Sequence, residues 1–137
     1  MGERGLKAHF AMFARYNAWA NRRLFDAAAP LPDADRRRDL GAFFGSIHRT
    51  LNHLLVTDVI WMARLRGVAP PRWGLDHVAH DGFEDLRAAR AAMDADMLGF
   101  VAGLEEADLT RRVRYRTISA PAEVTQPLAE ALAHLFN

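Results

Sequence analysis

The sequence contains no cysteine. This absence excludes a disulfide framework, a metal site built from thiolates and a cysteine nucleophile. Any metal ion must therefore be held by imidazole and oxygen ligands. Any thiol chemistry must use a thiol that a substrate or cofactor supplies.

The chain also lacks an excess of charge of one sign and a long apolar run. Its 18 basic and 17 acidic residues leave a formal net charge of +1, which gives no reason to expect a nucleic acid as partner. The uncharged runs are far shorter than the roughly 20 residues that span a bilayer. The N-terminal stretch MGERGLKAHF lacks the apolar core of a signal peptide. We expect one cytoplasmic domain over residues 1–137, with no membrane segment.

Helical periodicity is the strongest feature that the sequence does contain. Apolar residues recur at three- and four-residue spacing in four windows, as on the buried face of a helix. Ser46 is a suitable N-cap for the second window and Gly67 a suitable glycine after its end. Pro127 suits the first turn of the last window. The predicted helices cover residues 7–28, 46–66, 83–104 and 127 to the end.

Long connections separate these windows. Residues 33–45 form a mixed connection with room for one short turn of helix. Further on, Val113, Tyr115 and Thr117 alternate with arginines, which is a strand pattern, and the following AEVTQ can complete a small hairpin. The sequence therefore predicts an all-α four-helix bundle with a minor β-hairpin before the last helix. The long connections argue against a simple up-down-up-down order.

Histidines are the candidate metal ligands in a chain without cysteine. Five residues turn a helix by about 140°, so His48 and His53 cannot both bind one ion from the second helix. Periodicity slightly favours His48 as the inward residue of the two. His134 lies at the polar edge of a leucine stripe near the end of the sequence. His77 and His80 have a spacing that suits a metal clip, although exposure in a loop is the simpler expectation. For each of these histidines, a packed or solvated side chain remains the alternative to a ligand.

Several polar and aromatic residues have a structural and a functional reading. Asp58 lies on an apolar helix face, where a buried carboxylate must be paired. We expect its partner to be an arginine or a Trp or Tyr donor, with a structural role first and a catalytic one second. We expect Tyr16 and Trp19 to pack in the bundle, and Asn17 and Asn21 to form hydrogen bonds with neighbouring connections.

Three stretches, taken together, resemble the DinB family of damage-inducible-type proteins. They are YNAWANRRLFDA, GSIHRTLNHLLVTDVIWMARLRG and LAHLFN, in that order along nearly the whole chain. The resemblance implies a four-helix bundle with up-down-down-up connections that is usually dimeric. It also implies a divalent metal ion, nickel or zinc, held by three histidines.

The resemblance assigns the first metal ligand to the histidine of TLNHLL, which is His53, and this overrides the small preference for His48. The other two ligands form a His-x-x-x-His motif directly after LFN, where a spacing of four puts both on one helix face. The sequence given ends at Asn137, before both of them. His134, one turn upstream of the first, is expected to line the site or to substitute as a ligand. We expect weak or absent metal binding by residues 1–137 alone.

Relatives in the wider superfamily imply the first function hypothesis. They include thiol-dependent S-transferases and isomerases that use low-molecular-weight thiols, so this chain is expected to be a metal-dependent enzyme of a thiol-transferase or hydrolase type. No catalytic residue is assigned. The alternatives are a non-catalytic dimeric metal-binding or stress-response scaffold and a purely structural helical dimer. We expect a homodimer through the first two long helices, because Val56 and Ile60 lie away from the main apolar stripe.

Overall fold

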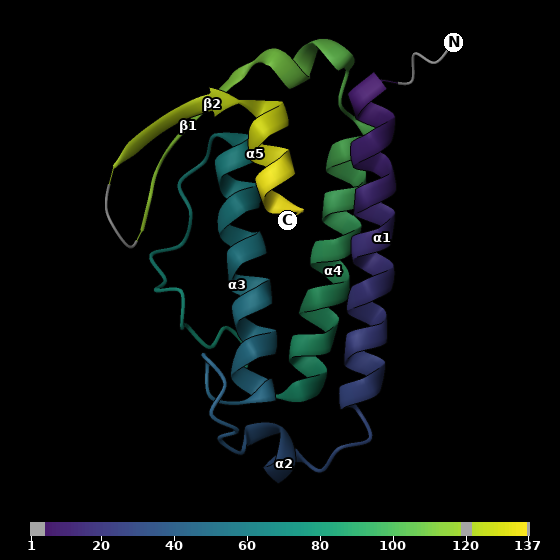
Figure 1. Ribbon diagram of the computed structural model, residues 1–137, viewed down its shortest axis with the longest axis vertical. Helices are drawn as coiled ribbons and strands as arrows, with labels where there is room; N and C mark the ends of the chain where they lie inside the picture. Colours follow the sequence, from purple (N-terminus) through teal and green to yellow (C-terminus); the bar gives the residue numbers. More distant parts are fainter. Residues whose placement is uncertain (1–4, 119–121, 137) are drawn as a thin grey trace.

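The computed structural model describes residues 5–118 and 122–136, which are mostly helical (Figure 1). Three long helices lie side by side, a short helix lies at one end, and the last helix packs beside them at the other end. In this described part, no helix has the length and apolar character needed to cross a membrane. The helices are α1 (Gly5–Ala28), α2 (Asp33–Arg37), α3 (Ile47–Arg66), α4 (Phe83–Ala102) and α5 (Leu128–Leu135).

The helical windows and the short turn in the first connection are thus confirmed, with ends that differ by one or two residues. The predicted hairpin is also confirmed. Strands β1 (Arg112–Arg116) and β2 (Glu123–Pro127) pair in antiparallel register, with Tyr115 opposite Val124. A 3₁₀ turn (Glu106–Thr110) connects α4 to β1.

Both predicted ends of α3 are confirmed by local geometry. The Ser46 hydroxyl accepts a hydrogen bond from the Arg49 amide at 3.1 Å, which satisfies one of the free amides at the helix start. Gly67 ends the helix at φ 72°, a left-handed conformation that glycine adopts without steric cost. The start of α5 was predicted wrongly by one position. Pro127 has an extended ψ of 148° because it pairs with Arg112 as the last residue of β2.

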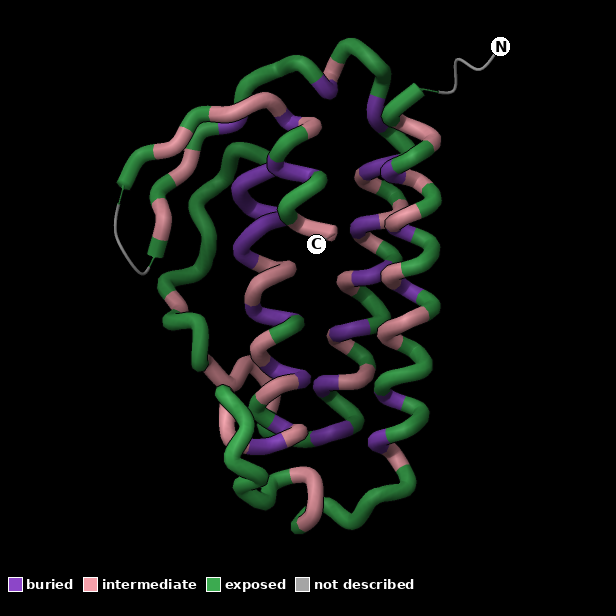
Figure 2. The backbone as a smooth tube through the Cα atoms, in the orientation of Figure 1, coloured by how far each residue is buried: buried purple, intermediate pink, exposed green. Residues whose placement is uncertain are grey.

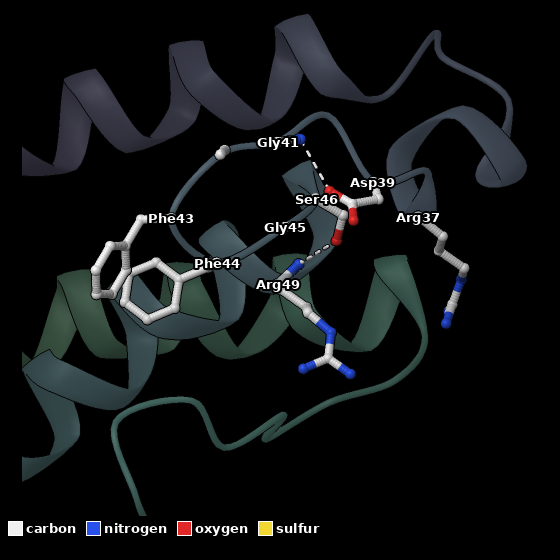
Figure 3. A pocket seen from close by; sticks show the side chains of 9 residues that line it. Arg37, Asp39, Gly41, Phe43, Phe44, Gly45, Ser46 and Arg49 are labelled. Carbon is white, nitrogen blue, oxygen red and sulfur yellow. Dashed lines mark hydrogen bonds between the residues drawn. The ribbon is translucent and has the colours of Figure 1, made fainter.

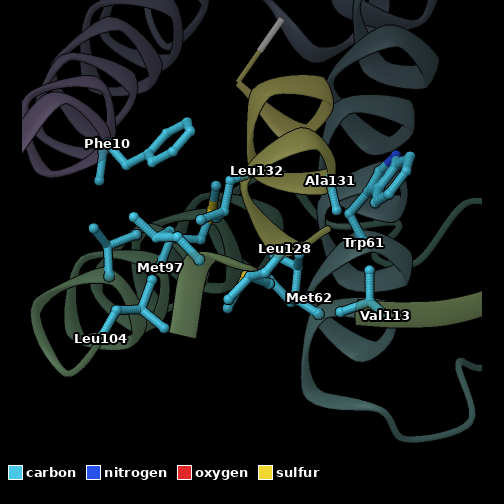
Figure 4. Close-up of a cluster of buried hydrophobic side chains, with 13 residues drawn as sticks. Phe10, Trp61, Met62, Met97, Leu104, Val113, Leu128, Ala131 and Leu132 are labelled. Atoms are coloured by element: carbon cyan, nitrogen blue, oxygen red, sulfur yellow. The ribbon is translucent and has the colours of Figure 1, made fainter. Parts of the chain in front are cut away.

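Apolar side chains meet between the helices in two clusters. One surrounds the contact between α5 and the long helices (Figure 4), where Leu128 and Leu132 of α5 meet Trp61 and Met97. The other lies toward α2 and contains Phe25. Buried positions line the facing sides of the long helices (Figure 2). The first cluster fixes α5, and with it His134, against α3.

The residues that suggested a dimer surface are buried inside the chain. Val56 is 0% exposed and Ile60 is 2% exposed. The connection between α3 and α4 covers this face of α3, where the Asn52 side chain bonds both the amide and the carbonyl of His80 at 3.0 and 3.1 Å. The stated reason for a dimer through this face is therefore wrong, while the dimer itself stays a prediction.

We predicted that Tyr16 and Trp19 pack in the bundle, and this prediction is wrong. They are 60% and 48% exposed, and their rings contact each other on the outer face of α1 with centroids 5.6 Å apart. Asn21 and Asn17 point the other way, toward α4. The Asn21 amide donates to Asp94 at 3.0 Å, and the Asn17 amide lies 3.9 Å from the sulfur of Met97. Their partners are thus helix residues, whereas we expected connections.

Candidate metal centre

His53 is held in one orientation by two contacts. Its Nδ1 lies 2.8 Å from the carbonyl oxygen of Leu75, and its ring stacks on Phe44 with centroids 3.8 Å apart and planes inclined by 23°. A carbonyl oxygen only accepts, so Nδ1 carries the proton and donates it. The lone pair of a neutral imidazole is then on Nε2. Metal-binding histidines commonly have this arrangement, in which the other ring nitrogen donates to a fixed acceptor.

His134 reaches the same cavity from α5. Its ring lies against Trp61, with centroids 4.5 Å apart and planes inclined by 33°. The cavity has a volume of about 370 Å³. The structure therefore brings the two predicted ligands, His53 and His134, to one space between α3, α5 and the hairpin. The cavity is lined by His53, Thr57, Ile60, Trp61, Arg64, Leu75, Thr117, Ile118 and His134.

The donor chemistry of His53 fits a divalent ion, but the described residues do not complete a site. Within residues 5–118 and 122–136, no group of three His, Cys, Asp or Glu side chains is placed to hold a metal ion. A catalytic zinc site generally has about three protein ligands. His53 and His134 offer two nitrogens. Metal binding at these residues stays a prediction.

His48, His77 and His80 are not among the residues that line this cavity. His48 is buried, as periodicity favoured, and its Nε2 lies 3.8 Å from Asp81 in a separate cavity. Burial lowers the pKa of the His48 imidazole, and the nearby Arg37 lowers it further. His77 stacks on Trp73 with centroids 4.6 Å apart. His77, like His80, is half-buried, so the expectation of simple exposure in a loop is wrong.

Another cavity, of about 470 Å³, lies at the start of α3, and no histidine is among its lining residues (Figure 3). Arg37 and Arg49 line one side of it, and the rings of Phe43 and Phe44 lie on another. Its contribution to the candidate centre is Phe44, the ring that stacks on His53. The cavity with the two histidines is therefore the better candidate for metal chemistry.

A second cavity, of about 330 Å³, adjoins the cavity that His53 and His134 line. Trp61 and His134 line both cavities. Asp58 lines this second cavity, and its carboxylate bonds Arg90 Nη2 at 2.5 Å. The prediction of an arginine partner for Asp58 is confirmed. The same Arg90 bonds Asp94 Oδ1 through Nη2 at 2.7 Å and through Nε at 3.0 Å.

Burial raises the pKa of both carboxyl groups, and for both the Arg90 guanidinium opposes this shift. Sequence reasoning did not identify Arg90 or Asp94 as buried. Their burial could have been inferred from their spacing, because Arg90 and Asp94 lie on the same face of α4 as the apolar Leu86 and Met97.

Arg64 is a buried residue that lines the cavity of His53 and His134. Sequence reasoning did not identify it either. It is 8% exposed, its Nη2 donates to the Arg116 carbonyl at 3.1 Å, and its guanidinium lies between two rings. The centroid of Trp61 is 4.6 Å away and that of Tyr115 is 4.3 Å away. Burial lowers the pKa of the Arg64 guanidinium, although an arginine remains charged at neutral pH. In the sequence, Arg64 looks like an ordinary basic residue in the last turn of a helix.

The geometry thus defines a mostly helical protein with a histidine-lined cavity beside its last helix. The DinB family model matches residues 1–137, the whole chain, and the protein belongs to the DinB family. Neither the curated proteins nor the solved structures contain a match.

Proposed function

We propose that this DinB protein binds a divalent metal ion, nickel or zinc, with Nε2 of His53 as a ligand. The observation that carries the proposal is the hydrogen bond from His53 Nδ1 to the Leu75 carbonyl, together with the stacked ring of Phe44. These contacts fix the tautomer and the ring plane before any ion binds. The cavity that His53 shares with His134 supports His134 as a lining residue or a further ligand.

The proposal includes the family's up-down-down-up four-helix bundle. The three long helices have 24, 20 and 20 residues, whereas α5 has 8. The second cavity opens at the end of α5 and is lined by Asn17, Leu54 and Arg90 from the three long helices. The resemblance implies that the His-x-x-x-His ligands lie on the last helix of the bundle, directly after the LFN stretch.

The proposed reaction is a thiol-dependent transfer, or a hydrolysis, in which a low-molecular-weight thiol or a water is the nucleophile. A bound divalent ion lowers the pKa of such a group. Within the chain, the Leu75 carbonyl retains the proton on His53 Nδ1, and Trp61 packs against the His134 ring. The cavity volume of about 370 Å³ suits a small molecule.

A specific observation favours the alternative, a non-catalytic metal-binding or stress-response scaffold. The carboxylate of Asp58 lines the second cavity, but it is engaged by Arg90 at 2.5 Å. Its Oδ2 already accepts a hydrogen bond from Arg90, so this oxygen is not free to take a proton from a substrate. Transfer of a small thiol by metal-loaded protein would support the enzyme, and metal binding without transfer would support the scaffold.

We further propose that the protein forms a homodimer through α1. The support is the exposed aromatic pair of Tyr16 and Trp19, with Met12 one turn away and 42% exposed. Light scattering of the purified chain at micromolar concentration tests this. We expect a dimer mass for the natural sequence and a monomer mass for Trp19→Glu. A monomer mass for the natural sequence would contradict the proposal.

Metal content tests the proposed metal site. The 137-residue chain is compared with the same chain extended past Asn137 by a helical His-x-x-x-His segment, each titrated with zinc and nickel. We expect one tightly bound ion per extended chain and weak binding by the shorter one, since about three protein ligands are needed. His53→Ala should abolish binding in the extended chain, while the control His48→Gln on the same helix should preserve it. Stoichiometric metal in the shorter chain that survives His53→Ala would place the site elsewhere.

A further inference from the structure

Arg64 is a buried cation for which the described chain supplies no counter-ion. It is 8% exposed, and no carboxylate within residues 5–118 and 122–136 forms an ion pair with it. A guanidinium has five N–H donors, and the hydrogen bond from Nη2 to the Arg116 carbonyl uses one of them. Nε is buried and has no hydrogen-bond partner. Burying a charge is costly unless it is paired and hydrogen-bonded.

The two aromatic rings compensate only part of this cost. Trp61 and Tyr115 lie 4.6 and 4.3 Å from the Arg64 guanidinium carbon, within the range of a cation–π contact. The Tyr115 hydroxyl accepts a hydrogen bond from Gln126 at 2.9 Å. The rings therefore hold the guanidinium plane in place but do not satisfy its N–H groups.

The cavity beside Arg64 has the matching electrostatic character. Its lining contains the guanidinium of Arg64, the imidazoles of His53 and His134, and the side chain of Thr57. Among its nine described lining residues, none is acidic. A cavity lined by one cation and no carboxylate, and closed partly by apolar side chains, attracts an anion. Its volume of about 370 Å³ admits a small organic molecule.

We propose that this cavity binds a small organic anion, with the Arg64 guanidinium holding a carboxylate or phosphate group beside His53. A guanidinium presents parallel N–H donors that fit either group with two hydrogen bonds. The assignment of this anion as the substrate class of a metal-dependent reaction rests on the proposed function. Anion binding itself requires no metal ion, and the two can be tested separately.

A purely structural role for Arg64 makes a different prediction. By donating to the Arg116 carbonyl, Arg64 connects α3 to β1. If that were its whole role, substitutions of Arg64 would change stability but the protein would show no saturable anion site. Ligand binding by folded protein therefore separates the two roles.

The experiment titrates the metal-free 137-residue chain, in the presence of a chelator, with acetate or inorganic phosphate. Ionic strength is held constant with sodium chloride, which is the reference anion. Calorimetry and the fluorescence of Trp61, one of three tryptophans, report binding. We expect saturable binding of at least one of the two probes. Stronger acetate binding would identify a carboxylate ligand, and stronger phosphate binding a phosphorylated one.

Matched arginine variants test the assignment to Arg64. Arg64→Met should weaken binding about tenfold or more, because a charge-assisted pair is lost. The control is Arg66→Gln, two residues on, whose guanidinium is already paired with Asp96 at 2.7 Å; it should bind as the natural sequence does. Arg64→Lys keeps the charge but lacks the two parallel N–H donors of a guanidinium, and it should weaken binding less than Arg64→Met. It provides the test if Arg64→Met does not fold.

The two titrations separate this proposal from the metal site. Anion binding is measured on the metal-free chain in a chelator and metal binding on the extended chain, so either proposal can fail while the other stands. The proposal is overturned if neither probe saturates beyond chloride, or if the Arg64 variants bind as Arg66→Gln does.

Discussion

Two arginines are buried within residues 5–118 and 122–136, and their surroundings differ. Arg90 of α4 is 3% exposed and contacts two carboxylates, Asp58 and Asp94, at 2.5 and 2.7 Å. Arg64 of α3 is 8% exposed and contacts two aromatic rings and one carbonyl. Burial of a cation therefore does not define a ligand site. The presence or absence of a counter-ion separates a closed structural cluster from a place where a ligand can supply the missing charge.

The position of each arginine agrees with this distinction. Arg90 connects all three long helices, because Asp58 lies on α3 and Asp94 also accepts from Asn21 of α1. Removing Arg90 leaves the carboxylates of Asp58 and Asp94 buried without a cation. Arg64 instead faces a cavity between α3, α5 and the hairpin. The first cluster is expected to determine stability, and the second to determine binding.

The largest expected effect follows from replacing Arg90. In Arg90→Met, the carboxylates of Asp58 and Asp94 lose their shared cation and remain buried. Breaking a buried ion pair by removing one partner costs about 3–5 kcal/mol. We expect a decrease of this size in the free energy of unfolding, measured by urea denaturation at pH 7. The triple variant that adds Asp58→Asn and Asp94→Asn should recover part of the loss, and a loss below about 1 kcal/mol in Arg90→Met would show that the cluster is not structural.

The pH dependence of stability reports on the same cluster. The pKa of Asp58 is raised from its ordinary value of 3.8, chiefly by burial. An acid with a raised pKa in the folded state contributes stability that is fully present below its unfolded pKa and is lost as the pH rises through the folded pKa. As the pH rises from about 4, the free energy of unfolding of the natural sequence should therefore fall relative to that of Asp58→Asn. Denaturation curves of the two proteins, collected over this window, measure the difference.

Surface acids give a pH dependence of the opposite sign. Hydrogen bonds from Arg37, Arg66 and Arg114 lower the pKa of their partner carboxylates, Asp81, Asp96 and Glu123. These contributions are lost as the pH falls, but they are equal in the two proteins and cancel in the difference. A difference that is flat with pH would contradict a raised pKa for Asp58.

Replacing Arg64 should have a smaller effect on stability than replacing Arg90. Arg64→Met removes a charge that has no carboxylate partner, so no buried anion is left behind. The losses are the hydrogen bond to the Arg116 carbonyl and the contacts with the two rings, together about 1–2 kcal/mol. Urea denaturation in chloride measures this value. Equal losses in Arg64→Met and Arg90→Met would remove the distinction between the two arginines.

Much of the fold could be predicted from the sequence because its signals are local. The ends of α3 follow from the hydroxyl of Ser46 and the conformational freedom of Gly67, and both act within a few residues. The hairpin follows from alternation around Tyr115. Burial was predicted less well, since it depends on what covers a helix. Val56 and Ile60 are buried on the face of α3 that carries Asn52, whose side chain bonds the connection between α3 and α4, and periodicity within α3 does not indicate such a cover.

The candidate site was predicted only where a family resemblance or an isolated polar residue pointed to it. His53 came from the resemblance, and the arginine partner of Asp58 came from the cost of an unpaired buried carboxylate. That this arginine is Arg90 depends on two residues 32 positions apart in different helices. The same limit applies to Arg64, whose neighbour Tyr115 is a strand residue. A basic residue in the last turn of a helix is usually solvated, so its burial becomes visible only in three dimensions.

The smallest effect is expected at a third arginine, which completes the comparison. Arg66 forms two hydrogen bonds of 2.7 Å with the carboxylate of Asp96, a better geometry than any contact of Arg64. However, the two side chains are 40% and 41% exposed, so water and salt screen the pair and solvate either partner after a substitution. Arg66→Gln should therefore change the free energy of unfolding by about 0–1 kcal/mol, and by less at high salt. Denaturation of Arg66→Gln at low and at high salt measures this, and a loss as large as that of Arg90→Met would mean that burial is not what makes the Arg90 cluster strong.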